Sequence, residues 1–207
     1  MNLLISIIAI SVFSALLPVI IGYKERSILW YYAVIAFIAD VFGIFCHYYR
    51  YSSSWTVDIF FLLEWLLISQ YLILSCFTGK SRFYANIISI LVALLYIIQT
   101  LVHGLNEPNL QGAAPFYVFY ILGAMVAFYR VTQNIEIIQI EKSPIFVFST
   151  GLLLYASGSL IMILLKRYLD EANESFSAYM WIVHDVLNVI KNVAIAFTLH
   201  LQKRKPL

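Results

Sequence analysis

Ionisable side chains inside long apolar segments are the residues of this 207-residue chain best able to do chemistry. They are Asp40, Glu64, His184, Asp185 and Lys191. A charged group in hydrocarbon costs about 2.5–3.5 kcal/mol on membrane-insertion scales, so each one requires a partner or a use. Carboxylates, an imidazole and an ammonium can bind a ligand or an ion, relay protons, or pair one helix with another. We therefore expect binding or chemistry to centre on these groups.

The last apolar segment, residues 178–201, has the most regular polar pattern. Its polar side chains are His184, Asp185, Asn188, Lys191 and Asn192. At about 100° of rotation per residue of an α-helix, all of them fall within an arc of about 120°. Such a face must point to the interior of a helix bundle or to a watery cavity, because hydrocarbon cannot solvate it.

The spacing of the charges predicts contacts between helices. Asp185 and Lys191 lie about 120° apart around their helix, so each needs a partner elsewhere, and Asp40 and Glu64 are the candidates for Lys191. At about 1.5 Å per residue, Asp40, Glu64, His184 and Asp185 lie about 10–12 Å below one membrane surface, and Lys191 lies about 20 Å below it. If their helices are neighbours, the sequence predicts a polar cluster in one half of the bundle with a lysine beneath it.

The segments that position these residues have the composition of membrane-spanning helices. The chain is 62% hydrophobic and 12% charged, against about 45–50% and 25% for soluble domains. Apolar stretches of roughly 20 residues match a hydrocarbon core of about 30 Å, and only a helix satisfies its own backbone there. We predict an all-α membrane protein of a single domain, 1–207, with seven transmembrane helices at about 2–21, 28–48, 57–77, 84–103, 116–130, 144–166 and 178–201.

Lysine and arginine residues predict how this bundle is oriented. One side of the predicted membrane carries Lys24, Arg26, Lys80, Arg82, Arg130, Lys142, Lys203, Arg204 and Lys205. The other side carries Arg50, Lys166 and Arg167. Basic residues favour the cytoplasmic side, so we expect a cytoplasmic C-terminus and an outer N-terminus in the inner (plasma) membrane. Aromatic residues near the predicted helix ends, among them Tyr32 and Trp55, are expected as interfacial anchors.

Smaller features predict local packing. Gly151 and Gly158 are seven residues apart and share one helix face, which favours close approach of a neighbouring helix. Asp58 and His47 lie nearer to the outer surface, where we expect them to be hydrated. The connection 132–143 mixes isoleucine with glutamate, so a short interfacial helix is one interpretation of it.

Several chemistries are disfavoured. Cys46 and Cys76 fall near opposite surfaces, too far apart for a disulfide, and no CxxC motif exists. A single deep histidine, His184, is too few for a zinc site, and no GxSxG frame exists for a hydrolase. The net charge of +2 and the lack of a basic helix give no reason to expect nucleic acid. We predict no metal and no cofactor.

A lysine in the seventh helix is also a feature of microbial rhodopsins. Those proteins carry an aspartate four residues before the lysine that binds retinal. In this chain Leu187 stands four residues before Lys191, and Asp185 stands six before it. The pattern therefore departs from theirs at the position that matters most.

The chain resembles uncharacterised seven-helix integral membrane proteins that are common in Bacteroidetes-type bacteria. The resemblance rests on residues 55–65, on residues 146–158, and on the segment from Trp181 to His184 followed by Asn188 and Asn192. It covers most of the chain and implies the same architecture, but no activity. Lys191 has no match in that pattern.

Three functional hypotheses remain open beside a purely structural role in which the polar groups only hydrogen-bond neighbouring helices. The first is a non-enzymatic bundle that binds or senses a small ligand and acts through a membrane or cytoplasmic signalling protein, such as a kinase. The second is a small-solute or proton-coupled transporter. The third is an intramembrane enzyme that modifies lipids. The absence of a recognisable catalytic set favours the first.

Overall fold

The computed structural model describes residues 2–24, 26–49, 54–104, 108–133, 139–172 and 174–204. The α-helices are α1 (Asn2–Gly22), α2 (Ile28–Tyr49), α3 (Ser54–Cys76), α4 (Gly79–His103), α5 (Ala114–Gln133), α6 (Pro144–Ala172) and α7 (Glu174–Arg204). Two short 3₁₀ helices, Gln111–Ala113 and Ile140–Lys142, precede α5 and α6. The described residues contain no strand, as the absence of alternating hydrophobicity leads one to expect.

Each of the seven segments predicted from hydropathy forms a helix, but several helices are longer than the prediction. Residues 79–82, which the predicted segments leave between two helices, form the first turn of α4, and α5 continues past Arg130 to Gln133. Hydropathy marks only the apolar part of a helix, whereas backbone hydrogen bonds continue into polar flanking residues. In the connection 132–143, residues 134–138 lie outside the described residues, and the described part contains only the 3₁₀ turn at 140–142.

Six helices of the described chain are long and apolar enough to cross a membrane. Their apolar stretches are Ile28–Cys46, Ser54–Cys76, Gly79–Val102, Gln111–Gln133, Pro144–Leu165 and Ile182–Lys203. In α1 the stretch Ile10–Gly22 is apolar but shorter. This composition indicates a multi-pass membrane protein.

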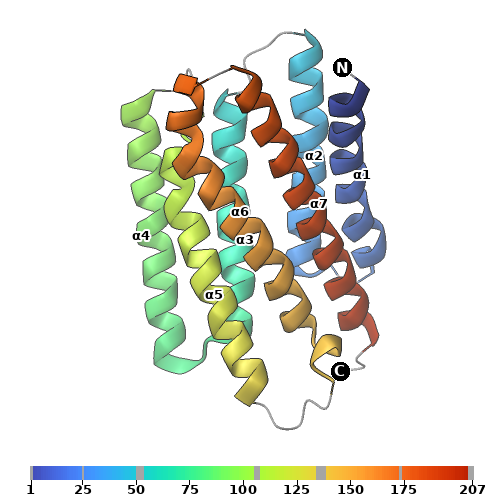
Figure 1. Ribbon diagram of the computed structural model, residues 1–207. Coiled ribbons are helices and arrows are strands. Elements are labelled where there is room, and N and C mark those ends of the chain that lie inside the picture. Colours follow the sequence, from blue (N-terminus) through green and yellow to red (C-terminus); the bar gives the residue numbers. More distant parts are fainter. Residues whose placement is uncertain are drawn as a thin grey trace.

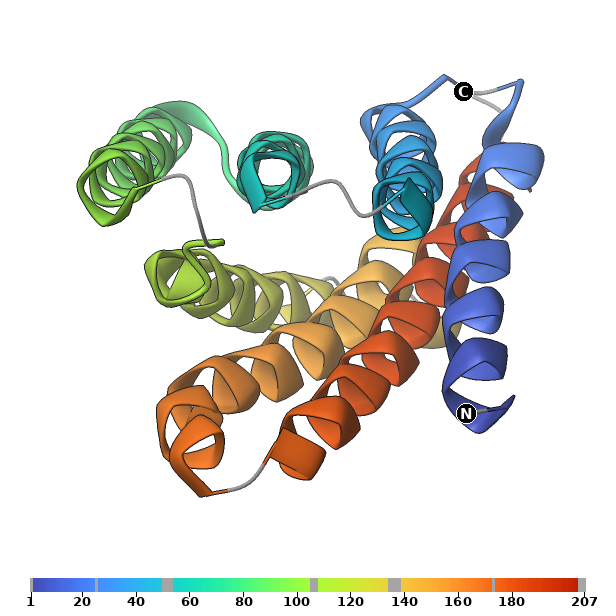
Figure 2. The ribbon, with the colours of Figure 1, turned by 90° about the horizontal axis from the view of Figure 1, so that it is seen from above.

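The helices form a ring with one helix outside it. Going round, α1 packs on α2, α2 on α3, α3 on α5, α5 on α6, α6 on α7, and α7 again on α1. Figure 2 shows α4 standing apart, against α3. The start of α1 and the end of α7 lie at opposite ends of the bundle (Figure 1). Because α2 and α7 also touch, helices α2, α3 and α7 can share side chains in the interior.

Helices α6 and α7 have the most extensive contact in the bundle. A methyl group added at Gly151 would collide with the side chain of Ala194, and one added at Gly158 would collide with Leu187. The predicted close packing at these two glycines is confirmed, and the neighbour that it brings near is α7. This packing fixes the face of α7 that carries the polar residues.

Trp65 anchors the outlying part of the bundle. Its fully buried ring stacks on Phe116 of α5 with centroids 4.5 Å apart, and its indole N–H donates to the carbonyl oxygen of Ser89 on α4 at 3.1 Å. Trp65 directly follows Glu64. The same turn of α3 therefore contacts α4 and α5 through Trp65 and places the carboxylate of Glu64 on a different face of the helix. Cys46 and Cys76 are both free, in line with the prediction that they do not pair, and both are buried.

Candidate functional site

An ion pair between α3 and α7 lies in the interior of the bundle. The ammonium Nζ of Lys191 is 2.9 Å from Oε1 of Glu64, and each residue is only 2% exposed. Helical side chains lean toward the N-terminus of their own helix, and α3 and α7 both begin at the same end of the bundle (Figure 1). The long lysine therefore reaches back along α7 to the level of the shorter glutamate. Glu64 is one of the two partners that the sequence offered to Lys191.

Two tyrosines enclose this pair. The hydroxyl of Tyr32, on α2, donates to Oε1 of Glu64 at 3.3 Å. Nζ of Lys191 lies 3.8 Å from the ring centroid of Tyr155, on α6, and 5.3 Å from that of Tyr32. The negative face of an aromatic ring attracts a cation, most strongly where water is excluded. Four helices thus converge on one ammonium and one carboxylate.

The hydrogen bonding of the pair is incomplete. Oε2 of Glu64 and the hydroxyl of Tyr120, which is 1% exposed, have no hydrogen-bond partner. The two groups are close enough to interact electrostatically. A buried polar atom without a partner costs about 1–3 kcal/mol. Glu64 can therefore gain from a further donor, whether a proton, a water molecule or a polar ligand.

Three half-buried ionisable groups surround the pair: Asp40 on α2, and His184 and Asp185 on α7. Asp40 lies within electrostatic range of Lys191, Asp185 and Glu64. The ring of His184 is 5.8 Å, centroid to centroid, from the ring of Tyr155 that also covers Lys191. The five ionisable groups singled out in the sequence therefore gather in one region.

The cluster has two levels rather than one common depth. Glu64 receives its α2 hydrogen bond from Tyr32, which lies two helical turns, or about 12 Å along the axis, before Asp40. Glu64 is therefore deeper than Asp40, and the expected equal depth of these carboxylates is wrong. Helix α2 extends beyond the start of α3 at this end of the bundle (Figure 1), so counting from each helix end misjudged their offset.

The two asparagines of the polar face bond to a different helix. Nδ2 of Asn188 donates to Oγ of Ser11 at 3.2 Å, and Nδ2 of Asn192 donates to Oγ of Ser14 at 2.9 Å. Both serines belong to α1. The polar arc of α7 is thus divided between the ion pair and a row of hydrogen bonds that attaches α7 to α1.

Two residues of the interior were expected elsewhere. Tyr32 was expected at the membrane interface but is 1% exposed, because Tyr32, Ala36 and Asp40 recur every four residues on one inward face of α2. That recurrence was a usable signal. Asp58 was expected to be hydrated, yet it is 5% exposed. The side chain of His47 lies outside the described residues.

Asp58 belongs to a second polar group near the start of α3. Its Oδ1 accepts hydrogen bonds from the hydroxyl of Tyr96 at 2.7 Å and from the backbone N–H of Asn109 at 2.9 Å. The amide of Asn109 in turn donates to Thr100 and accepts from the backbone N–H of Gly112. This group attaches the segment before α5 to α3 and α4, and no feature of the sequence linked these residues.

The charge balance of the cluster indicates what it can bind. Within the described ranges, no three His, Cys, Asp or Glu side chains converge on a point where an ion could sit. The cluster holds three carboxylates, Asp40, Glu64 and Asp185, for one ammonium. A region with more acids than bases attracts a cation or a hydrogen-bond donor.

Comparison of the chain with protein-family models, with curated proteins and with solved structures finds no match. The resemblance noted in the sequence therefore stays a prediction, and the site is interpreted from its own geometry.

Proposed function

We propose that the chain is a seven-helix membrane protein that binds a small cationic or hydrogen-bond-donating ligand at the Glu64–Lys191 cluster and reports this binding to a partner protein. The observation that carries the proposal is the buried ion pair whose carboxylate keeps one oxygen without a partner. Ionisable groups inside a membrane are expensive to keep, so a retained and incompletely satisfied pair favours a use beyond packing.

The proposed orientation places the N-terminus outside and the C-terminus in the cytoplasm of the plasma membrane. It is supported by basic residues that lie in the terminal turns of helices or in the connections at one end of the bundle, among the described residues Lys24, Arg26, Lys80, Arg82, Arg130, Lys142, Lys203 and Arg204. Short connections rich in Lys and Arg remain on the cytoplasmic side. The half-buried Asp40 and Asp185 then face the outer half of the bundle.

A route from the site to the cytoplasmic end runs along α7. Helices α3 and α7 touch through Lys191 and Glu64, and again where Nε2 of Gln202 donates to the hydroxyl of Tyr71 at 3.0 Å. Gln202 is three turns closer to the C-terminal end than Lys191. A ligand that competes for Glu64 would loosen the first contact and shift α7 against α3 at the second. The basic C-terminal end would present that shift to an acidic surface of a membrane or cytoplasmic signalling protein.

A thermal-shift screen tests the proposal. The purified wild-type protein is heated in detergent with a panel of inorganic cations, primary amines and amino acids. We expect at least one compound to raise the Tm of the wild type but not that of Glu64→Gln or Asp185→Asn. Asn188→Ala, which removes a hydrogen bond to α1, is the matched control and should keep the response. Retention of the response by Glu64→Gln, Asp185→Asn and His184→Ala together would make the cluster structural.

Proton-coupled transport is the second candidate, favoured by one observation. Asp40, Glu64 and Asp185 lie within electrostatic range of one another or of Lys191, on two levels of the bundle, and carboxylates inside a membrane bundle are common members of proton relays. Flux into proteoliposomes that depends on a pH gradient and on Glu64 would favour transport. Ligand binding without flux across a broad solute panel would favour sensing.

A further inference from the structure

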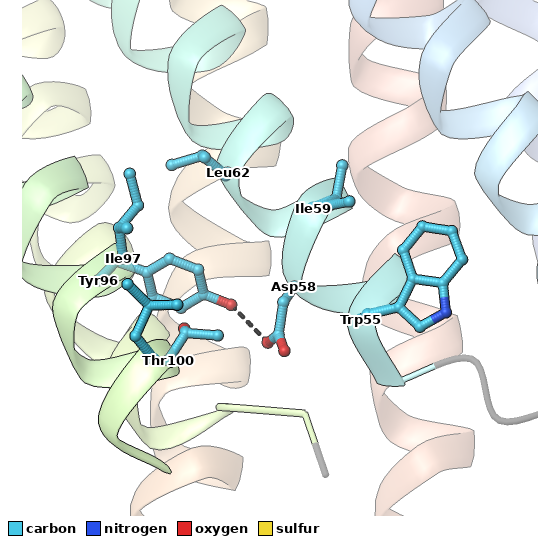
Figure 3. Close-up of a pocket in the computed structure, with 8 residues that line it drawn as sticks. Trp55, Asp58, Ile59, Leu62, Tyr96, Ile97 and Thr100 are labelled. Atoms are coloured by element: carbon cyan, nitrogen blue, oxygen red, sulfur yellow. Dashed lines mark hydrogen bonds between the residues drawn. The ribbon is translucent and has the colours of Figure 1, made fainter. Parts of the chain in front are cut away.

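A second site lies outside the ring of helices, between α3 and α4. A groove of about 370 Å³ separates the two helices. Figure 3 shows Asp58 of α3 pointing toward Tyr96 of α4, with Ile97 and Thr100 on the same side, whereas the ring of Trp55 points away from α4 and packs on Phe42 of α2. None of these residues belongs to the Glu64–Lys191 cluster, so the groove and that cluster can be tested separately.

The groove contains a carboxylate that is only half satisfied. Oδ1 of Asp58 accepts hydrogen bonds from Tyr96 and Asn109, which fix the orientation of the group. Oδ2 has no partner, although Asp58 is 5% exposed. The buried ion pair of Lys191 and Glu64 lies elsewhere, and Asp58 forms no ion pair with another residue that the structure describes. A buried carboxylate oxygen in this state calls for a cationic donor.

The remaining walls of the groove are apolar and ordered by depth. Asp58 lies four residues, or about 6 Å, inside the end of α3, which is the level of lipid headgroups and their glycerol linkage in a spanning bundle. Ile59 and Leu62 follow further along α3, and Ile97 faces them from α4. A groove with a charged group near the membrane surface and apolar walls below it is complementary to an amphiphilic molecule.

The groove is open to the lipid side of the bundle. At its edges Trp55, Ile59 and Leu101 are 49%, 50% and 70% exposed. Exposed apolar side chains on the outside of a membrane-spanning bundle contact lipid tails. A molecule can therefore enter this groove from within its own leaflet.

We propose that the α3–α4 groove binds a membrane phospholipid with a primary-amine headgroup. Its ammonium donates to Oδ2 of Asp58, while an acyl chain runs past Leu62 and Ile97. A quaternary ammonium has no N–H to donate, so a choline lipid satisfies Oδ2 less well. An anionic lipid is repelled by the carboxylate.

Native mass spectrometry of the purified full chain tests the proposal with three lipids of identical acyl chains. Phosphatidylethanolamine should bind more tightly than phosphatidylcholine or phosphatidylglycerol. Asp58→Asn keeps the size of the side chain and removes its charge, so it should weaken binding of the ethanolamine lipid about tenfold, the loss typical of a charge-assisted hydrogen bond. Glu141→Gln, an exposed acid at the other end of the bundle, is the matched control and should bind like the wild type.

A second variant separates loss of the site from loss of the fold. Ile97→Trp fills the groove from α4 and leaves Asp58 and its hydrogen bonds in place. It should also lose the preference for the ethanolamine lipid while keeping its thermal unfolding transition. The proposal is overturned if the wild type shows no preference among the three lipids. It is equally overturned if folded Ile97→Trp keeps the wild-type preference.

Discussion

Lys191 is enclosed by groups that suit an ammonium. Glu64 supplies the opposite charge at 2.9 Å, and the faces of Tyr155 and Tyr32 supply favourable quadrupoles at 3.8 and 5.3 Å. Removing one member of a buried ion pair costs about 3–5 kcal/mol, because the other charge is left uncompensated, whereas replacing both is often neutral. The pair is therefore a point at which a ligand could act with large effect.

A double-mutant cycle measures this coupling. Lys191→Met and Glu64→Gln should each lower the thermal stability of the protein in detergent, and the double variant should recover much of the loss. We expect a coupling free energy of about 1–3 kcal/mol. Effects that simply add would show that the two side chains do not depend on each other.

The ring of Tyr155 offers a second test at the same scale. Tyr155→Phe keeps the aromatic face over Lys191 and should cost less than about 1 kcal/mol of stability. Tyr155→Leu removes that face and should cost about 2 kcal/mol or more. The comparison is made by thermal unfolding of both variants. Equal losses would mean that the ring contributes packing volume and not attraction to the ammonium.

At the residue scale the sequence predicted the partner of the buried lysine, but it misplaced two residues that lie near other polar groups. The cost of an unpaired lysine in hydrocarbon pointed to Glu64 or Asp40 as its partner, and Glu64 is the one in contact. Tyr32 and Asp58 were misplaced because their depth was counted from helix ends. Depth depends on how far each helix extends past its neighbours, and this offset is a tertiary property.

At the scale of elements, the contact of α6 with α7 decides which residues face the interior. Gly151 and Gly158 let the two helices approach closely, and in this packing Lys191 of α7 reaches Glu64 of α3 and the ring of Tyr32 of α2. Periodicity identified the polar face of α7 and the glycine face of α6. Periodicity could not predict that Asn188 and Asn192 bond to α1, because several apolar helices are equally suitable neighbours of α7.

Alanine at two glycines tests this packing. Gly151→Ala should destabilise the protein by about 1–3 kcal/mol, because the new methyl group collides with Ala194 across the interface. Gly43 of α2 has open space where a Cβ would stand, so Gly43→Ala should be neutral or should stabilise by up to about 1 kcal/mol. Thermal unfolding of both proteins checks the expectation. A larger loss at Gly43 would contradict the assigned α6–α7 interface.

At the scale of the whole molecule, hydropathy was sufficient to predict where the helices lie in the sequence. The orientation in the membrane was predicted from basic residues near helix ends, and the fold itself does not test it. The two ends of the bundle differ in charge, since the described connections at one end carry most of the Lys and Arg. The order of helices around the ring was beyond the sequence, because lipid and protein neighbours are equally apolar.

Cysteine labelling tests the orientation. Single cysteines replace Tyr48, which is 78% exposed at the end of α2, or the exposed Lys80 at the start of α4, after Cys46 and Cys76 have been changed to alanine. A membrane-impermeant maleimide added to intact cells should label the Tyr48→Cys protein and should label the Lys80→Cys protein only after lysis. The reverse pattern would invert the proposed topology.

The central claim is that the Glu64–Lys191 pair sets the position of α7 relative to α3. Spin labels on Thr78→Cys, two residues after α3, and on Lys203→Cys, near the end of α7, report the distance between the C-terminal ends of these two helices by pulsed electron resonance. The account predicts that Glu64→Gln shifts or broadens this distance distribution, whereas Asn188→Ala leaves it unchanged. A distribution in Glu64→Gln identical to that of the otherwise unaltered protein would contradict it and would make the ion pair a static element of packing.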